Sequence, residues 1–238
     1  MINTAKSSMF RREGFTLIEL LIVIVVMAIL ATMLTPTISA VIQAADVRKS
    51  QAFVQRVARA ADAFKGANNG SYPGQDDIGQ LRGTTPDPGP YTGSQIIAAR
   101  LFDYPDTDIN KVAPKATSRY LEYKAYLLIT KSSKGSTIPK NSLADDSRTG
   151  NALLYFPSRR NVTAPTACYK WDDNSTYIKK DATSAKAAFE NKCAKDPRTG
   201  TVARNAGGIL IIGTGSNDKY LETSDNDDVK SWEIHKKN

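Results

Sequence analysis

One long hydrophobic segment near the start dominates the pattern of apolar and polar positions along this chain. Residues 15–34 are all hydrophobic except Thr16, Glu19 and Thr32. A helix of about 20 residues spans roughly 30 Å, which is the thickness of the hydrocarbon core of a bilayer. The segment is too long for a strand, and a helix satisfies its own backbone hydrogen bonds in lipid. The pattern therefore predicts a single transmembrane helix.

A second helical pattern follows Pro36, and this one is amphipathic. Apolar residues recur at three- and four-residue spacing as far as Phe64, with one break at Lys49, while charged residues occupy the opposite face. The sequence Asn-Asn-Gly at 68–70 is a typical end of a helix. Pro36 lacks a backbone N–H and should bend the helix. Residues 15–68 are thus predicted to form one bent helix of about 80 Å.

The remainder of the chain predicts a head of short, mixed elements. Tyr72-Pro73-Gly74 is a turn signal that should redirect the chain out of the helix. The patterns predict short helices at 94–102 and 184–190, strands at 119–129, 152–156 and 208–213, and a loop at 131–150. Residues 208–213 are continuously apolar, which favours a central strand. We expect an α+β fold in which an antiparallel sheet covers the apolar stripe of the long helix.

Glu19 is the exceptional residue of the transmembrane segment. A carboxylate inside such a segment costs about 2.5–3.5 kcal/mol on insertion scales, so it suggests a function. The short leader in front carries Lys6, Arg11 and Arg12, which should stay on the cytoplasmic side. A secretory signal peptide would have a shorter apolar core. An ordinary membrane anchor fits the length but leaves Glu19 without a role.

The sequence from Gly14 to Glu19, Gly-Phe-Thr-Leu-Ile-Glu, resembles the class III signal of type IV pilins and type II secretion pseudopilins. The resemblance covers residues 11–36 and includes Pro36 at the position of a helix-bending proline. It implies that a prepilin peptidase cleaves after Gly14 and methylates the new N-terminus at Phe15. It also implies that Glu19 pairs with the Phe15 amine of a neighbouring subunit in a filament.

This resemblance organises the chain into three parts. Residues 1–14 would be a cleaved leader, 15–68 the transmembrane and assembly helix, and 69–238 a periplasmic globular head. The fold would be pilin-like, with the long bent helix packed on an antiparallel sheet and a loop near the C-terminus. The protein would sit in the inner membrane with a single span, and its partners would include the assembly platform there.

Composition and charge exclude several classes of function. Charged residues make up 24% of the chain, which excludes a protein with many membrane spans. The formal net charge of +8 comes from scattered Lys and Arg residues and does not favour nucleic-acid binding, although some pilins take part in DNA uptake. His235 is the single histidine, so His-rich zinc sites are excluded and a Ser-His-Asp or Cys-His site is disfavoured.

The two cysteines, Cys168 and Cys193, form an even pair in a domain that the N-terminal signal would export. Such a pair indicates a disulfide in an oxidising compartment. Closing a loop of about 25 residues would stabilise the fold by roughly 3 kcal/mol. Two buried free thiols are the alternative.

An acidic segment follows the last predicted strand. Four aspartates and a glutamate lie between Asp218 and Asp228. Calcium prefers six to eight oxygen ligands of this kind, although the spacing is not that of an EF-hand. The segment resembles the C-terminal calcium loop of major pseudopilins, which implies Asp218, Asp225 and Asp228 as ligands and leaves Asp227 without a firm counterpart. A solvated acidic turn is the alternative.

Three functions follow from these features. The first is a structural subunit of a type II secretion pseudopilus, a periplasmic filament that drives protein export across the outer membrane; the calcium-like loop favours it. The second is a type IV pilin that serves adhesion, motility or DNA uptake. The third is a membrane-anchored periplasmic enzyme or binding module, which the lack of a catalytic constellation disfavours. In the first two, the partners are other copies and minor pseudopilins or pilins.

Overall fold

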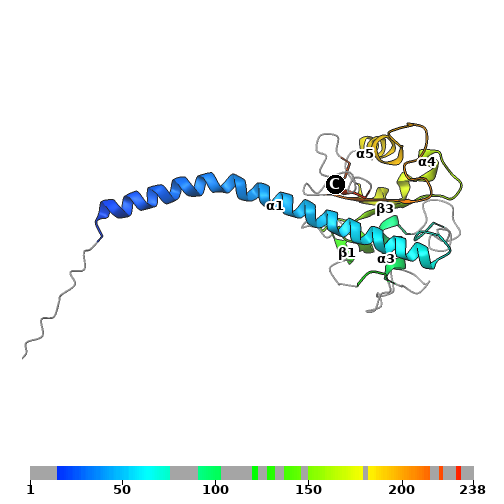
Figure 1. Ribbon diagram of the computed structural model, residues 1–238, viewed down its shortest axis with the longest axis horizontal. Coiled ribbons are helices and arrows are strands. Elements are labelled where there is room, and N and C mark those ends of the chain that lie inside the picture. The colour runs from blue at the N-terminus through cyan, green and yellow to red at the C-terminus, as the bar shows by residue number, and fades with distance from the viewer. Residues whose placement is uncertain are drawn as a thin grey trace, which may run out of the picture. The chain divides into compact units, whose positions relative to one another are not determined.

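The computed structural model describes residues 15–75, 91–102, 120–122, 128–131, 137–145, 150–178, 182–214, 220–221 and 229–231, and it confirms a long N-terminal helix followed by an α+β head (Figure 1). The chain divides into two compact units, Met1–Ile42 and Gln43–Asn238, so the division lies inside the long helix. The boundaries predicted from the cleavage motif and the helix end, 1–14, 15–68 and 69–238, stay predictions.

Helix α1 spans Leu17–Ala67, a length of 51 residues, and its end agrees with the prediction. Asn69 and Gly70 follow with positive φ angles of 51° and 78°. Gly70 donates its backbone N–H to the Lys65 carbonyl at 3.0 Å, which is the arrangement that closes many helices with a glycine. The helix continues through Pro36, whose side chain lies outside the described part. The bend expected there stays a prediction.

The head is built around a three-stranded antiparallel sheet in the order β3-β4-β5. Strand β3 is Leu154–Pro157, β4 is Ile209–Gly213 and β5 is Val229–Lys230. All residues of β3 and β4 are buried, because both faces of the sheet are covered. This burial explains why the sequence of β4 is continuously apolar, as predicted.

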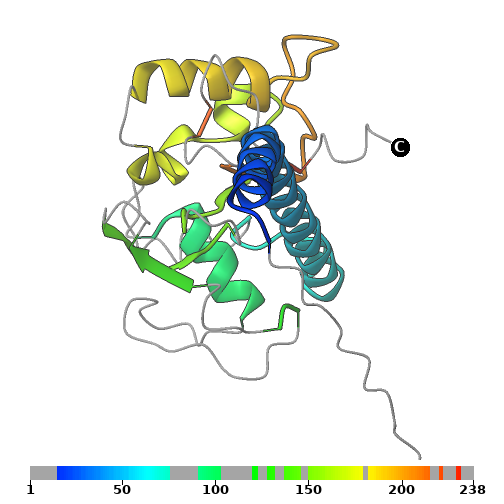
Figure 2. The same cartoon turned by 90° about the vertical axis from the view of Figure 1, so that its left-hand side faces the viewer.

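Each face of this sheet belongs to a different hydrophobic cluster. Tyr155, Ile209 and Ile211 point into a cluster with α1 and with α3, Gly93–Leu101. Leu154, Phe156, Leu210 and Ile212 pack in the other cluster. That cluster contains α4 (Pro165–Cys168), η2 (Trp171–Asp173), α5 (Ala182–Ala188) and the π-helix η4 (Phe189–Ala194). Figures 1 and 2 show α4 and α5 on one side of the sheet and α3 on the other.

A second, two-stranded sheet corrects part of the sequence prediction. Strand β1, Leu128–Lys131, pairs antiparallel with β2, Thr137–Leu143, inside the segment 131–150 that was predicted to be a loop. The prediction was wrong because β2 is largely polar and contains Pro139, which is tolerated in strands at a sheet edge. Of the strand predicted at 119–129, residues 128 and 129 lie in β1 as predicted, residues 120–122 are not in a strand, and 119 and 123–127 lie outside the described part.

The short helices are largely those expected. Helix α3 agrees with the helix predicted at 94–102, and Thr92 and Gln95 close its N-terminus with a capping box. Helix α5 starts earlier than the predicted segment 184–190 and continues into η4, which carries Cys193. A further short helix, η3, spans Ser175–Tyr177.

Candidate functional site

The N-terminal end of α1 forms a local hydrogen-bonded cap. Thr16 donates its backbone N–H and its hydroxyl to Glu19 Oε2, both at 2.8 Å, and the Glu19 N–H donates to Thr16 Oγ1 at 3.3 Å. This Thr-x-x-Glu arrangement is a capping box, which satisfies backbone donors that have no partner inside the helix. Glu19 therefore has a role within its own chain, and the sequence interpretation overlooked it.

The predicted cleavage point lies directly before this cap. Phe15 is the first described residue, and 82% of its surface is exposed. Gly14 lies outside the described residues. Cleavage between the two would create an amine one residue before the Thr16–Glu19 cap. The exposed carboxylate of Glu19 would then lie at the same end of the helix as this amine.

The apolar half of α1 has a continuous exposed hydrophobic surface along its described side chains. Large hydrophobic side chains from Leu17 to Ile42 are exposed throughout the described part of this half. In the part of the chain that the structure describes, α1 is the one helix that is long and apolar enough to cross a membrane. Such a continuous apolar surface requires lipid or other protein chains around it. The helix fits a single-pass anchor, as predicted.

The second half of α1 is, by contrast, part of the head. One of its faces is buried in the cluster that also contains α3 and one face of the sheet. The buried residues of this face are Ser50, Phe53, Val54, Val57, Ala60 and Ala61. The predicted apolar stripe is buried at Phe53, Val57 and Ala60 and partly buried at Phe64. Its earlier positions, Ile38, Ile42 and Ala45, are exposed. One continuous helix therefore contains both the exposed apolar segment and the part that is packed in the head.

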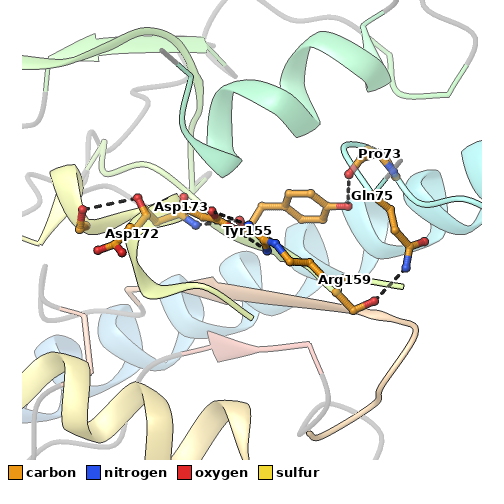
Figure 3. A network of polar contacts seen from close by, with 9 residues as sticks. Pro73, Gln75, Tyr155, Arg159, Asp172 and Asp173 are labelled. Atoms are coloured by element: carbon orange, nitrogen blue, oxygen red, sulfur yellow. Dashed lines mark hydrogen bonds and ion pairs between the residues drawn. The ribbon is translucent and has the colours of Figure 1, made fainter. Parts of the chain in front are cut away.

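Polar contacts fasten the turn after α1 to the sheet (Figure 3). The Tyr155 hydroxyl donates to the Pro73 carbonyl at 2.8 Å, and Gln75 Nε2 donates to Ser158 Oγ at 2.9 Å. On the other side of β3, Asn174 Nδ2 donates to the Tyr155 carbonyl at 2.7 Å. The predicted turn at Tyr72-Pro73-Gly74 is thus a fixed connection between α1 and β3.

Tyr72 adds a contact between this turn and the last turns of α1. Its hydroxyl donates to Asp62 Oδ1 at 2.8 Å, and Lys65 Nζ lies 4.5 Å from the centre of its ring. Burial, with the nearby Asp62 carboxylate, raises the pKa of Tyr72 to about 12. The phenol therefore stays protonated and keeps its hydrogen bond at neutral pH.

The two cysteines are free thiols in the structure, so the predicted disulfide is not formed there. Both are fully buried in the cluster on the α4–α5 side of the sheet, Cys168 at the end of α4 and Cys193 in η4. These two elements pack against each other. Burial raises the pKa of the Cys168 thiol, and hydrogen bonds from the backbone N–H groups of Arg159 and Gly207 partly oppose this.

The predicted calcium ligands Asp218, Asp225, Asp227 and Asp228 lie outside the described residues. The structure does describe what surrounds them in sequence. Gly213 in β4 pairs with Val229 in β5, so the two ends of segment 215–228 are held beside each other. Tyr220 and Leu221, in the middle of the segment, are buried, and the Tyr220 hydroxyl bonds to the Ala152 carbonyl. In the described part, no three metal-ligating side chains gather.

The sequence interpretation overlooked two buried carboxylates. Asp145 accepts hydrogen bonds from Ser50 and Thr214, and Asp173 pairs with Arg159. Asp145 lay in the segment 131–150 that was predicted to be a loop, and Asp173 was given no role. Only the contacts of the folded chain identify them as buried.

Comparison with known proteins identifies one motif. The prokaryotic N-terminal methylation motif matches residues 9–35. This match covers Gly14, Phe15 and Glu19 and identifies the N-terminal segment as prepilin-like, as the sequence predicted. No curated protein and no solved structure matches the chain.

Proposed function

We propose that this protein is a structural subunit of a type II secretion pseudopilus, which assembles through its N-terminal helix and helps to drive proteins across the outer membrane. The observation that carries the proposal is the methylation motif at 9–35, which extends into a helix whose large hydrophobic side chains from Leu17 to Ile42 are exposed in the described part. A processed helix of this kind anchors the subunit in the inner membrane before assembly and packs beside other copies afterwards.

Assembly requires that a buried charge finds a partner. Inside a filament core, the Glu19 carboxylate would be removed from water, and a buried carboxylate without a cation is strongly destabilising. The amine of Phe15 in a neighbouring subunit supplies that cation only after cleavage behind Gly14. Processing by the prepilin peptidase thereby controls when copies and minor pseudopilins can join. The work of the protein in this proposal is assembly.

The acidic segment supports a pseudopilus over a pilus. Its Asp-x-x-Asp-Val-x-x-Trp sequence resembles the calcium loop of major pseudopilins, with Asp225 and Asp228 as side-chain ligands and Asp218 before them. The pairing of β4 with β5 brings the two ends of this segment together, as a loop around one ion requires. A type IV pilin remains the second candidate, because the segment from Cys168 to Cys193 resembles the disulfide-bounded region of pilins.

A deletion strain separates these two functions. Complementation with the wild-type gene, with Gly14→Ala or with Gly14→Val is compared by two measurements, the proteins released into the medium and the surface pili seen by electron microscopy. A pseudopilin requires that deletion and Gly14→Val abolish protein release while Gly14→Ala retains it. Loss of surface pili with normal protein release would favour the pilin, and no change in either would overturn both.

A further inference from the structure

Asp145 is a buried carboxylate that joins three separate parts of the head. Its side chain accepts hydrogen bonds from the Ser50 hydroxyl and from the backbone N–H and hydroxyl of Thr214, the latter two at 2.7 Å and 2.8 Å. Asp145, Ser50 and Thr214 each have no exposed surface. Ser50 belongs to α1, Asp145 follows β2, and Thr214 directly follows β4. We call these three residues the Asp145 clasp.

The absence of a side chain at Gly213 leaves room for the Asp145 carboxylate. A side-chain Cβ on Gly213 would lie 2.9–3.0 Å from all three atoms of the Asp145 carboxylate, closer than normal packing allows. Glycine at 213 therefore leaves the space that the carboxylate fills. The Asp145 backbone is fixed as well, because its N–H donates to the Asn151 carbonyl at 2.8 Å.

The clasp lies where α1 enters the head. Ser50 is the first fully buried residue along the described side chains of α1, and Val47 before it is only partly buried. Val47 already packs against the core cluster of the head, and fully buried hydrophobic packing begins with Phe53 and Val54. A hydrogen bond to a charged group contributes about 1.5–3 kcal/mol. The clasp is therefore a strong polar contact at the first fully buried position of α1.

We propose that Asp145 is a positioning residue of the assembly helix, which fixes α1 against the head at Ser50, its first fully buried residue. The same carboxylate bonds to Thr214, directly after β4, so it also ties the helix to the central strand. Asp145 acts through these two partners. The inference rests on the proposed function only in naming α1 the assembly helix.

Hydrogen exchange on the full-length protein in detergent micelles tests the proposal. Asp145→Ala and Ser50→Ala should each lower the protection of amides around Ser50 by about tenfold or more, while amides around Val57 and Ala61 change little. Thr214→Val, which keeps the backbone donor, should have a smaller effect at the same amides. Asp145→Asn should retain most protection, since its amide oxygen can accept from Thr214 and its N–H can donate to Ser50 Oγ.

The control is Asp173→Asn, which removes a buried charge in the other cluster of the head. It should lower protection across the head without a particular loss at Ser50. If Asp145→Ala does not fold, Ser50→Ala decides the outcome alone. Equal losses at Ser50 and at Ala61, or the same pattern in Asp173→Asn, would overturn the proposal. The exchange pattern does not depend on whether filaments form, so it can fail while the proposed function stands.

Discussion

Arg159 and Asp173 form a two-point ion pair on the face of the sheet that carries Trp171 and Phe189. Arg159 Nη1 and Nη2 each lie 3.3 Å from one oxygen of the Asp173 carboxylate. The Asp173 side chain is fully buried, whereas 19% of the Arg159 side chain is exposed. Arg159 lies two residues after the end of β3, and Asp173 ends η2. The pair therefore joins the sheet to the short helices that cover it.

This difference in burial predicts unequal effects of the two single substitutions. Arg159→Met leaves a buried carboxylate without its cation and should lower the free energy of unfolding by about 3–5 kcal/mol. Asp173→Ala should lower the free energy of unfolding by less, because the remaining guanidinium of Arg159 can reach water. Urea unfolding of the head, residues 43–238, measures both. If the two substitutions lower the free energy of unfolding equally, or if Arg159→Met lowers it less, the ion pair is effectively solvated.

Processing at Gly14 is the second prediction. Intact-mass analysis of the protein extracted from membranes should show the loss of residues 1–14 and the gain of one methyl group at Phe15. Gly14→Ala should still be cleaved, because a small residue is sufficient there, and Gly14→Val should leave the precursor uncut. A mature chain that begins at Met1, or that is cut behind the apolar segment, would contradict the prepilin interpretation.

Glu19 has two roles that can be separated by substitution. Glu19→Gln preserves the capping box with Thr16 but removes the charge, whereas Glu19→Val removes both. If the charge sets the stagger between subunits, both variants should be cleaved normally and both should fail to assemble. Glu19→Val should also insert into lipid more favourably, by about 2.5–3.5 kcal/mol. If Glu19→Gln forms filaments at the wild-type level, the charge is not needed for assembly and Glu19 acts only as a helix cap.

The long helix and the central strand were predictable because each is set by local chemistry. Residues 15–34 are too apolar for water and too long for a strand, and β4 is apolar at every position because both faces of its sheet are covered. The helix end at Asn69 and Gly70 was also readable, since few residues adopt positive φ there.

The clasp and the second sheet were not predictable for the opposite reason. Asp145 and Ser50 are 95 positions apart, and nothing in the local sequence of either indicates the other. In β2, Ile138 and Leu143 are buried together with Asn141 and Ser142, so the strand has no simple alternation of polar and apolar residues. Tertiary contacts decide such positions, and their local sequence is compatible with a loop.

The cysteine pair gives the fourth prediction. In the exported protein, Cys168 and Cys193 should form a disulfide between α4 and η4, and intact mass should be lower by two hydrogens than after reduction. Because burial raises the pKa of Cys168, little thiolate is present at neutral pH, so alkylation must follow denaturation. Reduction should lower the stability of the head by roughly 3 kcal/mol. If both cysteines are alkylated in protein isolated without reductant, they are free thiols and the disulfide prediction is wrong.

Calcium binding at the acidic segment is the last prediction. An ion held by Asp218, Asp225 and Asp228 would bind only the folded head and stabilise it by about 2.7 kcal/mol when free calcium is a hundred times the dissociation constant. The head should therefore melt at a higher temperature in calcium than in chelator. Magnesium should substitute poorly, because it requires a tighter octahedron and loses its water reluctantly.

The substitutions for this test follow from the surroundings of the segment. Asp225→Ala and Asp228→Ala should each abolish the calcium-dependent rise in melting temperature, measured by differential scanning calorimetry. A control substitution should remove an aspartate away from the acidic segment. Asp146→Ala is unsuitable, because Asp146 adjoins Asp145, whose carboxylate bonds to Thr214 immediately before the segment. Asp172→Ala is the better one, since Asp172 is exposed on η2. The same melting temperature in calcium and in chelator would leave the segment a solvated turn, and the preference would then move from the pseudopilus to the pilus.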